Sequence, residues 1–281
     1  MKQNDFTYEK LVSRNNPYIT PADQAIISSA RVLIAGCGIG SQVAEAAARA
    51  GFQHFILVDG DTIDLHNLNR QSFFSDQIGK YKVDSLKENI MRINPLAKVI
   101  AHPVNISLEN VTLLVQNSDV IFDTIDFLDL QNIVCLHDKA HSLKKILISS
   151  FSVGFGAALI TIPPHSGPCS SIRNIFNLPE FGDIGTISYA ERYIKLFSQV
   201  APQLDPIVIS AMQNVFTQLA DGKVCPAPQI IPGAQAVAAV CVSACIKALC
   251  YPSDFNGPEI QILNISKFLN EPGFKFQHES R

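Results

Sequence analysis

Between residues 31 and 149, short runs of apolar and often branched residues alternate with longer amphipathic or alanine-rich stretches. The short runs have the length of buried strands, whereas the longer stretches have helical spacing. This pattern predicts strands over 31–35, 54–58, 98–101, 119–123 and 145–149, separated by helices over 41–50, 82–93, 108–116 and 128–141. Strands that alternate with helices form βαβ units with right-handed crossovers. The chain is therefore predicted to be an α/β protein with a Rossmann-like, mainly parallel sheet flanked by helices.

The segments on either side of this region follow a different pattern. Thr20 and Pro21 mark the start of a short helix over 21–29, which follows a polar N-terminal arm. After residue 150, we expect a C-terminal part with antiparallel strands and extra helices. Its predicted elements are a strand over 155–162, a loop over 163–185, helices over 188–200 and 206–220, a long helix over 234–249 and a strand over 259–265 before a polar tail.

The composition argues against several classes of protein. The 281 residues are 47% hydrophobic and 17% charged, as in globular proteins, and the net charge of −3 disfavours a broadly basic nucleic-acid surface. The N-terminus lacks the apolar segment of a secretory signal. The most apolar stretch, 233–250, is interrupted by Gln235, Ser243 and Lys247 and is short for a membrane span of ~20 residues. The seven cysteines lack the spacing of a disulfide scaffold. We expect a cytoplasmic protein that contacts neither membranes nor nucleic acid.

A glycine-rich loop joins the first predicted strand to its helix and contains Gly36, Gly38, Gly40 and Ser41. Glycines allow the backbone to approach phosphate oxygens, which the N-terminus of a helix favours electrostatically. Asp59, at the end of the next strand, is placed to accept a hydrogen bond from a ribose hydroxyl. These features predict nucleotide binding. NAD is one candidate, but the loop has Ser41 where the dinucleotide pattern has its third glycine.

Charged and amide side chains further along the chain favour ATP over NAD. Asn67, Arg70 and Gln71 follow the second strand, Lys82 opens the next helix, and Asp126 follows the strand that ends at residue 123. The carboxyl ends of the strands in such a sheet converge on one crevice. Arg70 and Lys82 would neutralise phosphate charge there, and Asp126 would bind Mg²⁺ through oxygen. The sequence therefore predicts a site for ATP with Mg²⁺.

Four segments, in order, resemble the ThiF/MoeB/HesA superfamily, which includes proteins similar to ubiquitin-activating enzymes: RVLIAGCGIGS, LVDGDTIDLHNLNRQ, GKYKVDS with RINP, and VIFDTID. The resemblance covers about residues 10–170, with a weaker match at 225–250. It implies adenylation of a carboxylate by ATP, with release of pyrophosphate. It also implies a nucleotide-binding part over 31–150, an N-terminal arm and helix over 1–30, and an acceptor-side part of the same domain over 151–281.

The resemblance further implies roles for individual residues. Asp59 would bind the ribose, Asn67, Arg70 and Lys82 the phosphates, and Asp126 the Mg²⁺ ion. Asp61 stands in the second position of the family's D-x-D pattern. The segment 13–15 resembles the one from which Arg14 would reach the ATP of a neighbouring subunit in a homodimer. A solvated arm residue is the alternative for Arg14.

The cysteines and histidines depart from, or add little to, the family pattern. Many members hold zinc with two C-x-x-C pairs, but here Ile172 takes the second position after Cys169, so we expect no structural zinc. Cys169 and Cys225 are candidates for a thiol that accepts the acyl group, and unreactive loop thiols are the alternative. The pair His137 and His141 is expected to lie on a solvated helix face.

The expected activity is transfer of AMP to a carboxylate, either the C-terminus of a protein or peptide or a small molecule. Residues 177–225 are expected to shape the acceptor site, and the alternative is that their helices only cover the core. Two alternatives stay open: a tRNA-modifying dehydratase of the same superfamily, and a catalytically silent subunit that binds nucleotide. A silent subunit is free to lose Arg70, Lys82 and Asp126, all of which are present here.

Overall fold

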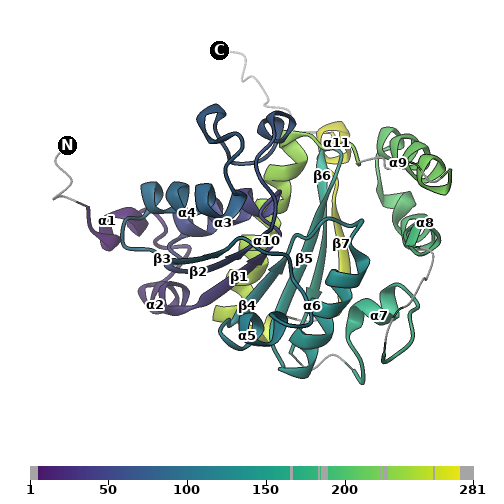
Figure 1. The fold of residues 1–281 in the computed structure, drawn as a ribbon. Helices are drawn as coiled ribbons and strands as arrows, with labels where there is room; N and C mark the ends of the chain where they lie inside the picture. The colour runs from purple at the N-terminus through teal and green to yellow at the C-terminus, as the bar shows by residue number, and fades with distance from the viewer. Residues whose placement is uncertain are drawn as a thin grey trace, which may run out of the picture.

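The computed structural model describes residues 6–164, 167–182, 184, 189–221, 223, 227–255 and 257–272. A seven-stranded sheet with the order β3-β2-β1-β4-β5-β6-β7 runs through the molecule (Figure 1). Strands β1 to β5 are parallel, whereas β6 and β7 are antiparallel additions at one edge. This arrangement confirms the predicted fold class. The strands are β1 Arg31–Ala35, β2 His54–Val58, β3 Lys98–His102, β4 Val120–Asp123, β5 Ile146–Val153, β6 Gly156–Ile162 and β7 Glu259–Leu263.

The order of the parallel strands reverses at β1, which lies between β2 and β4. Ala35, at the end of β1, is in register with Val58 of β2 and Asp123 of β4. The chain leaves β1 and β2 towards one face of the sheet and leaves β4 towards the other, which opens a crevice at their carboxyl ends. The topology therefore places the predicted ligand crevice beside the glycine-rich loop.

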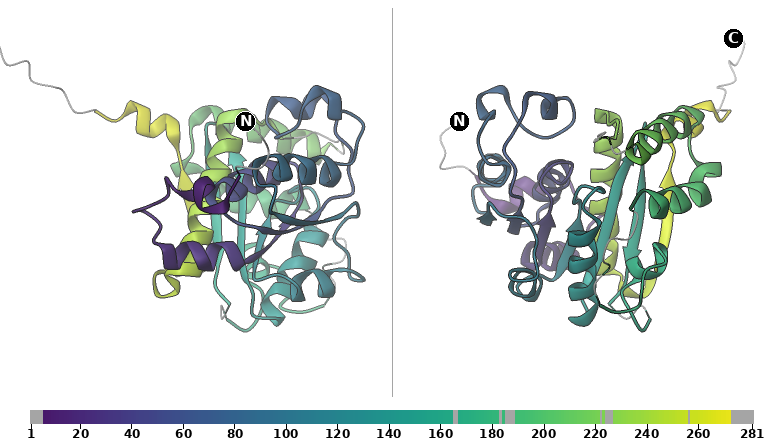
Figure 2. Two further views of the ribbon diagram at one scale, coloured as in Figure 1. Left: turned by 90° about the vertical axis from the view of Figure 1, so that its left-hand side faces the viewer. Right: turned by 45° about the vertical axis from the view of Figure 1, so that its right-hand side comes forward.

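Helices cover both faces of the sheet. Helices α2, α3, α4 and α10 pack over one face, where Val32 and Ile34 belong to the larger core, and α5 and α6 pack over the other, where Leu33 lies (Figures 1 and 2). Alternate side chains of one strand therefore enter different cores. The helices are α1 Tyr8–Val12, α2 Pro21–Ser29, α3 Gly40–Ala50, α4 Lys82–Ile93, α5 Val111–Gln116, α6 Leu130–Ser142, α7 Ser171–Ile175, α8 Tyr189–Val200, α9 Pro206–Ala220, α10 Ile231–Cys250 and α11 Ile265–Asn270, with 3₁₀ turns at Leu65–Asn69, Ser75–Gln77, Ala201–Gln203 and Pro252–Asp254.

Helix α10 has 20 residues and a mean hydropathy of 1.7, so by length and composition alone it could cross a membrane. It packs against α3, β5 and β6, and half of its apolar window is buried. Its fully buried residues include Val237, Cys241 and Cys245. Burial in the core accounts for the apolar character of this helix.

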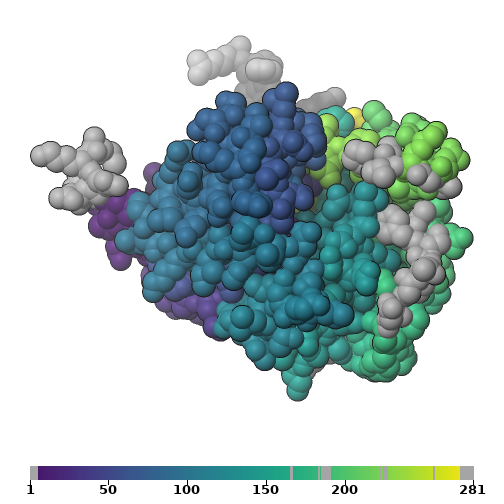
Figure 3. Space-filling view, viewed as in Figure 1, coloured from purple at the N-terminus to yellow at the C-terminus, as the bar shows by residue number. Residues whose placement is uncertain are grey.

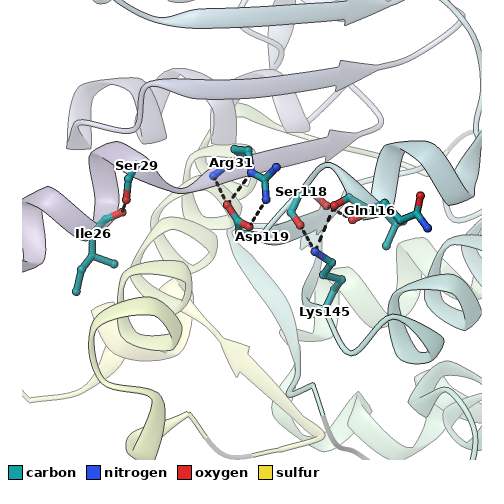
Figure 4. Close-up of polar contacts among 8 residues, drawn as sticks. Ile26, Ser29, Arg31, Gln116, Ser118, Asp119 and Lys145 are labelled. Carbon is teal, nitrogen blue, oxygen red and sulfur yellow. Dashed lines mark hydrogen bonds and ion pairs between the residues drawn. The ribbon is translucent and has the colours of Figure 1, made fainter.

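At the amino ends of β1 and β4, Arg31 forms a two-pronged ion pair with Asp119, with distances of 3.1 Å from Nε to Oδ2 and 2.7 Å from Nη2 to Oδ1 (Figure 4). Nearby, Lys145 Nζ donates to the carbonyl oxygen of Ser118 at 2.5 Å. These contacts join the amino ends of neighbouring strands, at the edge of the sheet away from the crevice. The side chains of Arg31 and Asp119 are 47% and 38% exposed, so solvent weakens their attraction.

The structure differs from the sequence-based prediction mainly in short elements. Helices α1, α7 and α11 lie in segments that were expected to be arm, loop and tail. Helix α1 packs through a tertiary contact, because the Tyr8 hydroxyl donates to the carbonyl of Gly51 at 2.8 Å. Helix α5 begins at Val111, three residues later than expected. Strand β5 continues to Val153 because its residues 147–153 pair with β6. The expected border at residue 150 falls inside β5.

Candidate active site

A cavity of about 380 Å³ lies at the carboxyl ends of β1, β2 and β4. In the space-filling view, residues 60–80 form the dark blue upper part of the molecule above this edge of the sheet (Figure 3). The cavity brings together most of the residues selected from the sequence. Its lining includes Gly36, Gly38, Asp59, Asp61, Asn67, Arg70, Gln71, Lys82 and Asp126.

The glycine-rich loop is shaped by contact with the segment after β4. Gly36 has a φ of +85°, and a Cβ atom added there would lie 2.4 Å from the carbonyl oxygen of Thr124. A Cβ on Gly40 would lie 2.4 Å from Thr124 Oγ1. The same hydroxyl donates to the Gly36 carbonyl at 2.6 Å. Gly36 therefore permits the turn, whereas Gly40 permits close packing of the start of α3.

Asp59 holds the glycine-rich loop and the following segment together. Its Oδ2 accepts the backbone N–H of Cys37 at 2.6 Å, and its Oδ1 accepts that of Asp61 at 2.8 Å. Burial raises the pKa of Asp59, and the nearby Lys82 charge and the two backbone donors oppose this increase. Because each carboxylate oxygen has a second lone pair, Asp59 keeps acceptor capacity towards the cavity.

Ser41 fixes the loop from the inside and does not line the cavity. Its hydroxyl donates to the Gly38 carbonyl at 2.6 Å and accepts the backbone N–H of Ser72 at 2.9 Å. Gln42 Nε2 also donates to the carbonyl of Arg70, at 3.1 Å. The start of α3 is therefore tied to the segment that carries Arg70.

Lys82 is buried at the start of α4, and its Nζ donates to Asp61 Oδ2 at 2.7 Å. The backbone N–H of Lys82 also donates to the carbonyl of Asp61, at 3.0 Å. Asp61 is exposed, with 67% of its side-chain surface accessible, and so is a replaceable partner for the Lys82 ammonium. Both residues line the cavity, where the ammonium can reach an anionic ligand.

Arg70 links the polar cavity to the segment before α10. Its Nε donates to Gln229 Oε1, and its Nη1 donates to the carbonyl of His66 at 2.9 Å. Burial lowers the pKa of Arg70, and the carboxylate of Asp126 opposes this shift. Asp126 is exposed, and its Oδ1 accepts the backbone N–H of Leu128 at 2.9 Å. A cation and a carboxylate therefore face the same space.

The two buried amide side chains in the cavity differ in their contacts. Asn67 Oδ1 accepts the backbone N–H of Asp64 at 3.0 Å and so stabilises the turn that carries Arg70. Gln71 lies against Gly38, and its Oε1 is buried without a hydrogen-bond partner among the residues that the structure describes. A buried acceptor of this kind is costly unless a ligand satisfies it.

Among the residues that the structure describes, no three or more His, Cys, Asp or Glu side chains come together in a group that could hold a metal ion. The chemistry of Mg²⁺ does not require one, because this ion is commonly held by one or two carboxylates together with substrate phosphates. Asp126 fits that requirement.

The sequence offers two cysteines as candidate acyl-accepting thiols. Cys169 is buried, its Sγ lies 3.6 Å from Asn174 Oδ1, and it does not line the cavity. Cys225 lies outside the described residues.

Arg14 is exposed and lies away from the cavity of its own chain. Its neighbour Asn15 donates to the carbonyl of Ala50, at the C-terminal end of α3, at 3.1 Å. The glycine-rich loop is at the other end of this 11-residue helix, which is about 16 Å long. Arg14 is therefore near the amino ends of the strands, whereas the nucleotide crevice lies at their carboxyl ends.

A buried polar cluster beneath the cavity corrects one expectation. His137 is not on a solvated helix face: it is buried, and its Nε2 lies 2.8 Å from Asp123 Oδ2. The Ser149 hydroxyl donates to the same carboxylate oxygen at 2.9 Å, and Asp123 Oδ1 accepts the N–H of Ile125 at 3.2 Å. The cluster fixes the start of the segment that leads to Asp126. His137 lies three and four residues after apolar positions of α6, and this spacing could have identified it as buried.

Comparison with known proteins identifies the family. The profile described as "ThiF family" matches residues 12–279. The chain belongs to the ThiF family. Among curated relatives, the adenylyltransferase and sulfurtransferase UBA4 of Eremothecium gossypii is 33% identical over 149 residues. That match covers 52% of this chain and 33% of UBA4, so this chain spans about a third of the length of that relative.

Solved structures of other proteins share the fold. Escherichia coli MccB, solved with ATP, matches with a TM-score of 0.59 and 22% identity, over 90% of this chain and 70% of MccB. The E. coli tRNA N6-threonylcarbamoyladenosine dehydratase TcdA matches with a TM-score of 0.60 and 18% identity, over 87% of this chain and 96% of TcdA. At these identities the likeness concerns the fold.

Proposed function

We propose that this chain is an ATP-dependent adenylyltransferase that activates a carboxylate as an acyl-adenylate and releases pyrophosphate. The observation that carries the proposal is that Arg70, Lys82 and Asp126 line the same cavity as the glycine-rich loop and Asp59. Two cations and a carboxylate beside a ribose acceptor match the needs of a triphosphate with Mg²⁺. Membership of the ThiF family and the name of the UBA4 relative support the same activity.

The reaction joins a carboxylate oxygen to the α-phosphorus of ATP and breaks the bond from that phosphorus to the bridging oxygen of pyrophosphate. The nucleophile is already an anion at neutral pH, so no general base is required. The main obstacle is repulsion between two anions, which positioned cations reduce. Arg70 and Lys82 would supply this charge, and the unpartnered Oε1 of Gln71 would accept a hydrogen bond from the nucleotide. Bound Mg²⁺, held by Asp126 and the phosphates, would add charge neutralisation.

Retention of all three charged residues supports an active enzyme over a silent subunit. We also propose a homodimer, because segment 13–15 resembles the family's arginine-donating arm. Arg14 is too far from the cavity of its own chain to serve it. A cytoplasmic location fits an activity that consumes ATP. The tRNA-dehydratase alternative is disfavoured by the net charge of −3 and would require tight tRNA binding with a steep dependence on salt.

The test is exchange of labelled pyrophosphate into ATP in the presence of candidate carboxylates. The wild-type protein should catalyse exchange only when an acceptor is present, and Asp126→Asn should reduce the rate at least 100-fold. Asp76→Asn is the matched control, because Asp76 is an exposed carboxylate outside the cavity lining. ATP binding without exchange for any carboxylate would contradict the proposal.

A further inference from the structure

A second cavity, of about 360 Å³, lies between the sheet and helices α8 and α9. Its floor comes from β5, β6 and β7, and its opposite wall comes from the two helices, which lie on the side of these strands away from α10 (Figure 2). Apolar side chains such as Phe151, Leu196, Val208, Met212 and Phe216 form most of the lining. Ligand pockets have volumes of about 300–1,000 Å³, and this cavity falls within that range.

The lining of this apolar cavity contains no charged side chain among the residues that the structure describes. Its side-chain polar groups belong to Ser152, Tyr193 and Gln229. Ser152 Oγ is buried without a hydrogen-bond partner in the described part of the chain. An occupant with charges in its body would lose hydration without gaining ion pairs, so the cavity selects an apolar body.

The apolar cavity adjoins the proposed ATP cavity and shares part of its wall. Phe127, Phe151 and Gln229 line both. Gln229 accepts a hydrogen bond from Arg70, so the polar end of the shared wall lies beside a residue proposed to bind phosphate. The ring of Phe127 packs edge-on against Tyr193 of α8, with centroids 5.3 Å apart, which holds α8 beside the shared wall. A molecule in the apolar cavity can therefore present a polar end to the nucleotide.

We propose that the acceptor is a small carboxylic acid with a bulky apolar body, such as a medium-chain or aryl-alkyl acid. The inference rests on the proposed adenylation and specifies its substrate class. The apolar body occupies the cavity under α8 and α9, and the carboxylate emerges beside Phe127 and Gln229. There the carboxylate oxygen attacks the α-phosphorus, pyrophosphate leaves, and no proton is transferred.

This assignment gives a role to the long segment between β6 and α10. A narrow, flexible peptide end would need a channel with backbone partners, whereas α8 and α9 enclose a wide apolar space. Burial of each further methylene should tighten binding about fourfold, which is ~0.8 kcal/mol, until the cavity is full. The dependence of affinity on chain length is therefore the diagnostic property.

The experiment measures hexanoate, octanoate and decanoate by titration calorimetry and by ATP–pyrophosphate exchange, with acetate and a peptide ending in Gly-Gly as polar probes. The expected result is a steady rise in affinity and in kcat/KM from hexanoate to decanoate. Ala211→Phe, on the cavity side of α9, should weaken decanoate binding at least tenfold and leave ATP binding unchanged. Ser210→Phe adds the same bulk at the neighbouring exposed position and should leave decanoate binding at the wild-type level.

The outcomes separate this inference from the proposed function. Exchange with acetate or the peptide, with no chain-length dependence and no effect of Ala211→Phe, would overturn the apolar acceptor and leave adenylation standing. Chain-length-dependent binding that Ala211→Phe abolishes, with no exchange, would establish an apolar-acid site and overturn adenylation. Unchanged ATP binding and melting temperature in Ala211→Phe show that the variant is folded.

Discussion

Lys82 Nζ lies 2.7 Å from Asp61 Oδ2, so the buried ammonium is already paired before any phosphate arrives. Asp61 is mostly exposed, and its carboxylate can turn to solvent when an anionic ligand takes its place. A surface-exposed partner contributes little to the stability of such a pair. The contact therefore keeps the Lys82 ammonium in the cavity, and breaking it to bind an anionic ligand costs little free energy.

Replacing Lys82 should weaken the site more than it weakens the fold. In Lys82→Met, the loss of one charge-assisted hydrogen bond to phosphate should reduce ATP affinity or exchange rate about 10- to 100-fold. Lys80→Met is the control, because Lys80 is exposed and outside the cavity lining. Calorimetric titration with ATP and exchange kinetics measure the effect. Equal behaviour of the two variants would remove Lys82 from the proposed site.

The raised pKa of Asp59 predicts a pH dependence. The fold favours the protonated form of Asp59. The stability that this adds is fully present below the pKa of the unfolded chain, near 3.8, and is lost as the pH rises through the higher pKa of the folded protein. Nucleotide binding has the opposite dependence, because the ionised form accepts the ribose hydroxyl. ATP affinity should therefore begin to fall at a higher pH than for an ordinary aspartate. Titrations between pH 4 and 8 should show this acidic decline, and Asp59→Asn should lack it.

Two glycines with similar backbone angles should respond differently to alanine. Gly36 and Gly79 have φ values of +85° and +84°, but only the Cβ on Gly36 meets another atom within 4 Å, at Thr124. Gly79→Ala should cost about 1 kcal/mol of stability from its backbone conformation. Gly36→Ala should cost more and should also weaken ATP binding, because the loop must move. Denaturant unfolding and ATP titration of both variants provide the comparison.

The buried pair of His137 and Asp123 should matter to stability. His137→Ala removes one of the three hydrogen-bond partners of the buried Asp123 carboxylate, the only one that can carry a positive charge, and should destabilise the fold by about 3–5 kcal/mol. His141→Ala, on the same helix but only partly buried, should change stability by less than about 1 kcal/mol. Chemical denaturation measures both. A similar small loss in the two variants would mean that Asp123 is satisfied without the imidazole.

Several elements were predictable because the local sequence signals for their ends agree with the bounds that tertiary packing allows. Helix α2 begins at the capping box of Thr20 and Asp23, and its predicted bounds are confirmed. Helix α4 likewise has its predicted bounds, with Lys82 first. In contrast, α7 has only five residues and lies in a segment rich in glycine and proline, so periodicity could not reveal it. Short elements are held by the surfaces they meet, and those surfaces are distant in the chain.

The sequence by itself determined the alternation that builds the parallel sheet, the glycine-rich loop and the family. These depend on local spacing and on residues whose order in the chain is their order in the fold. Only the tertiary structure decided that Gln229 meets Arg70 across 159 positions, and that α8 and α9 enclose an apolar space beside it. A cavity is a property of packed surfaces rather than of any one segment. Its apolar residues have the same pattern in the sequence as those of a filled core.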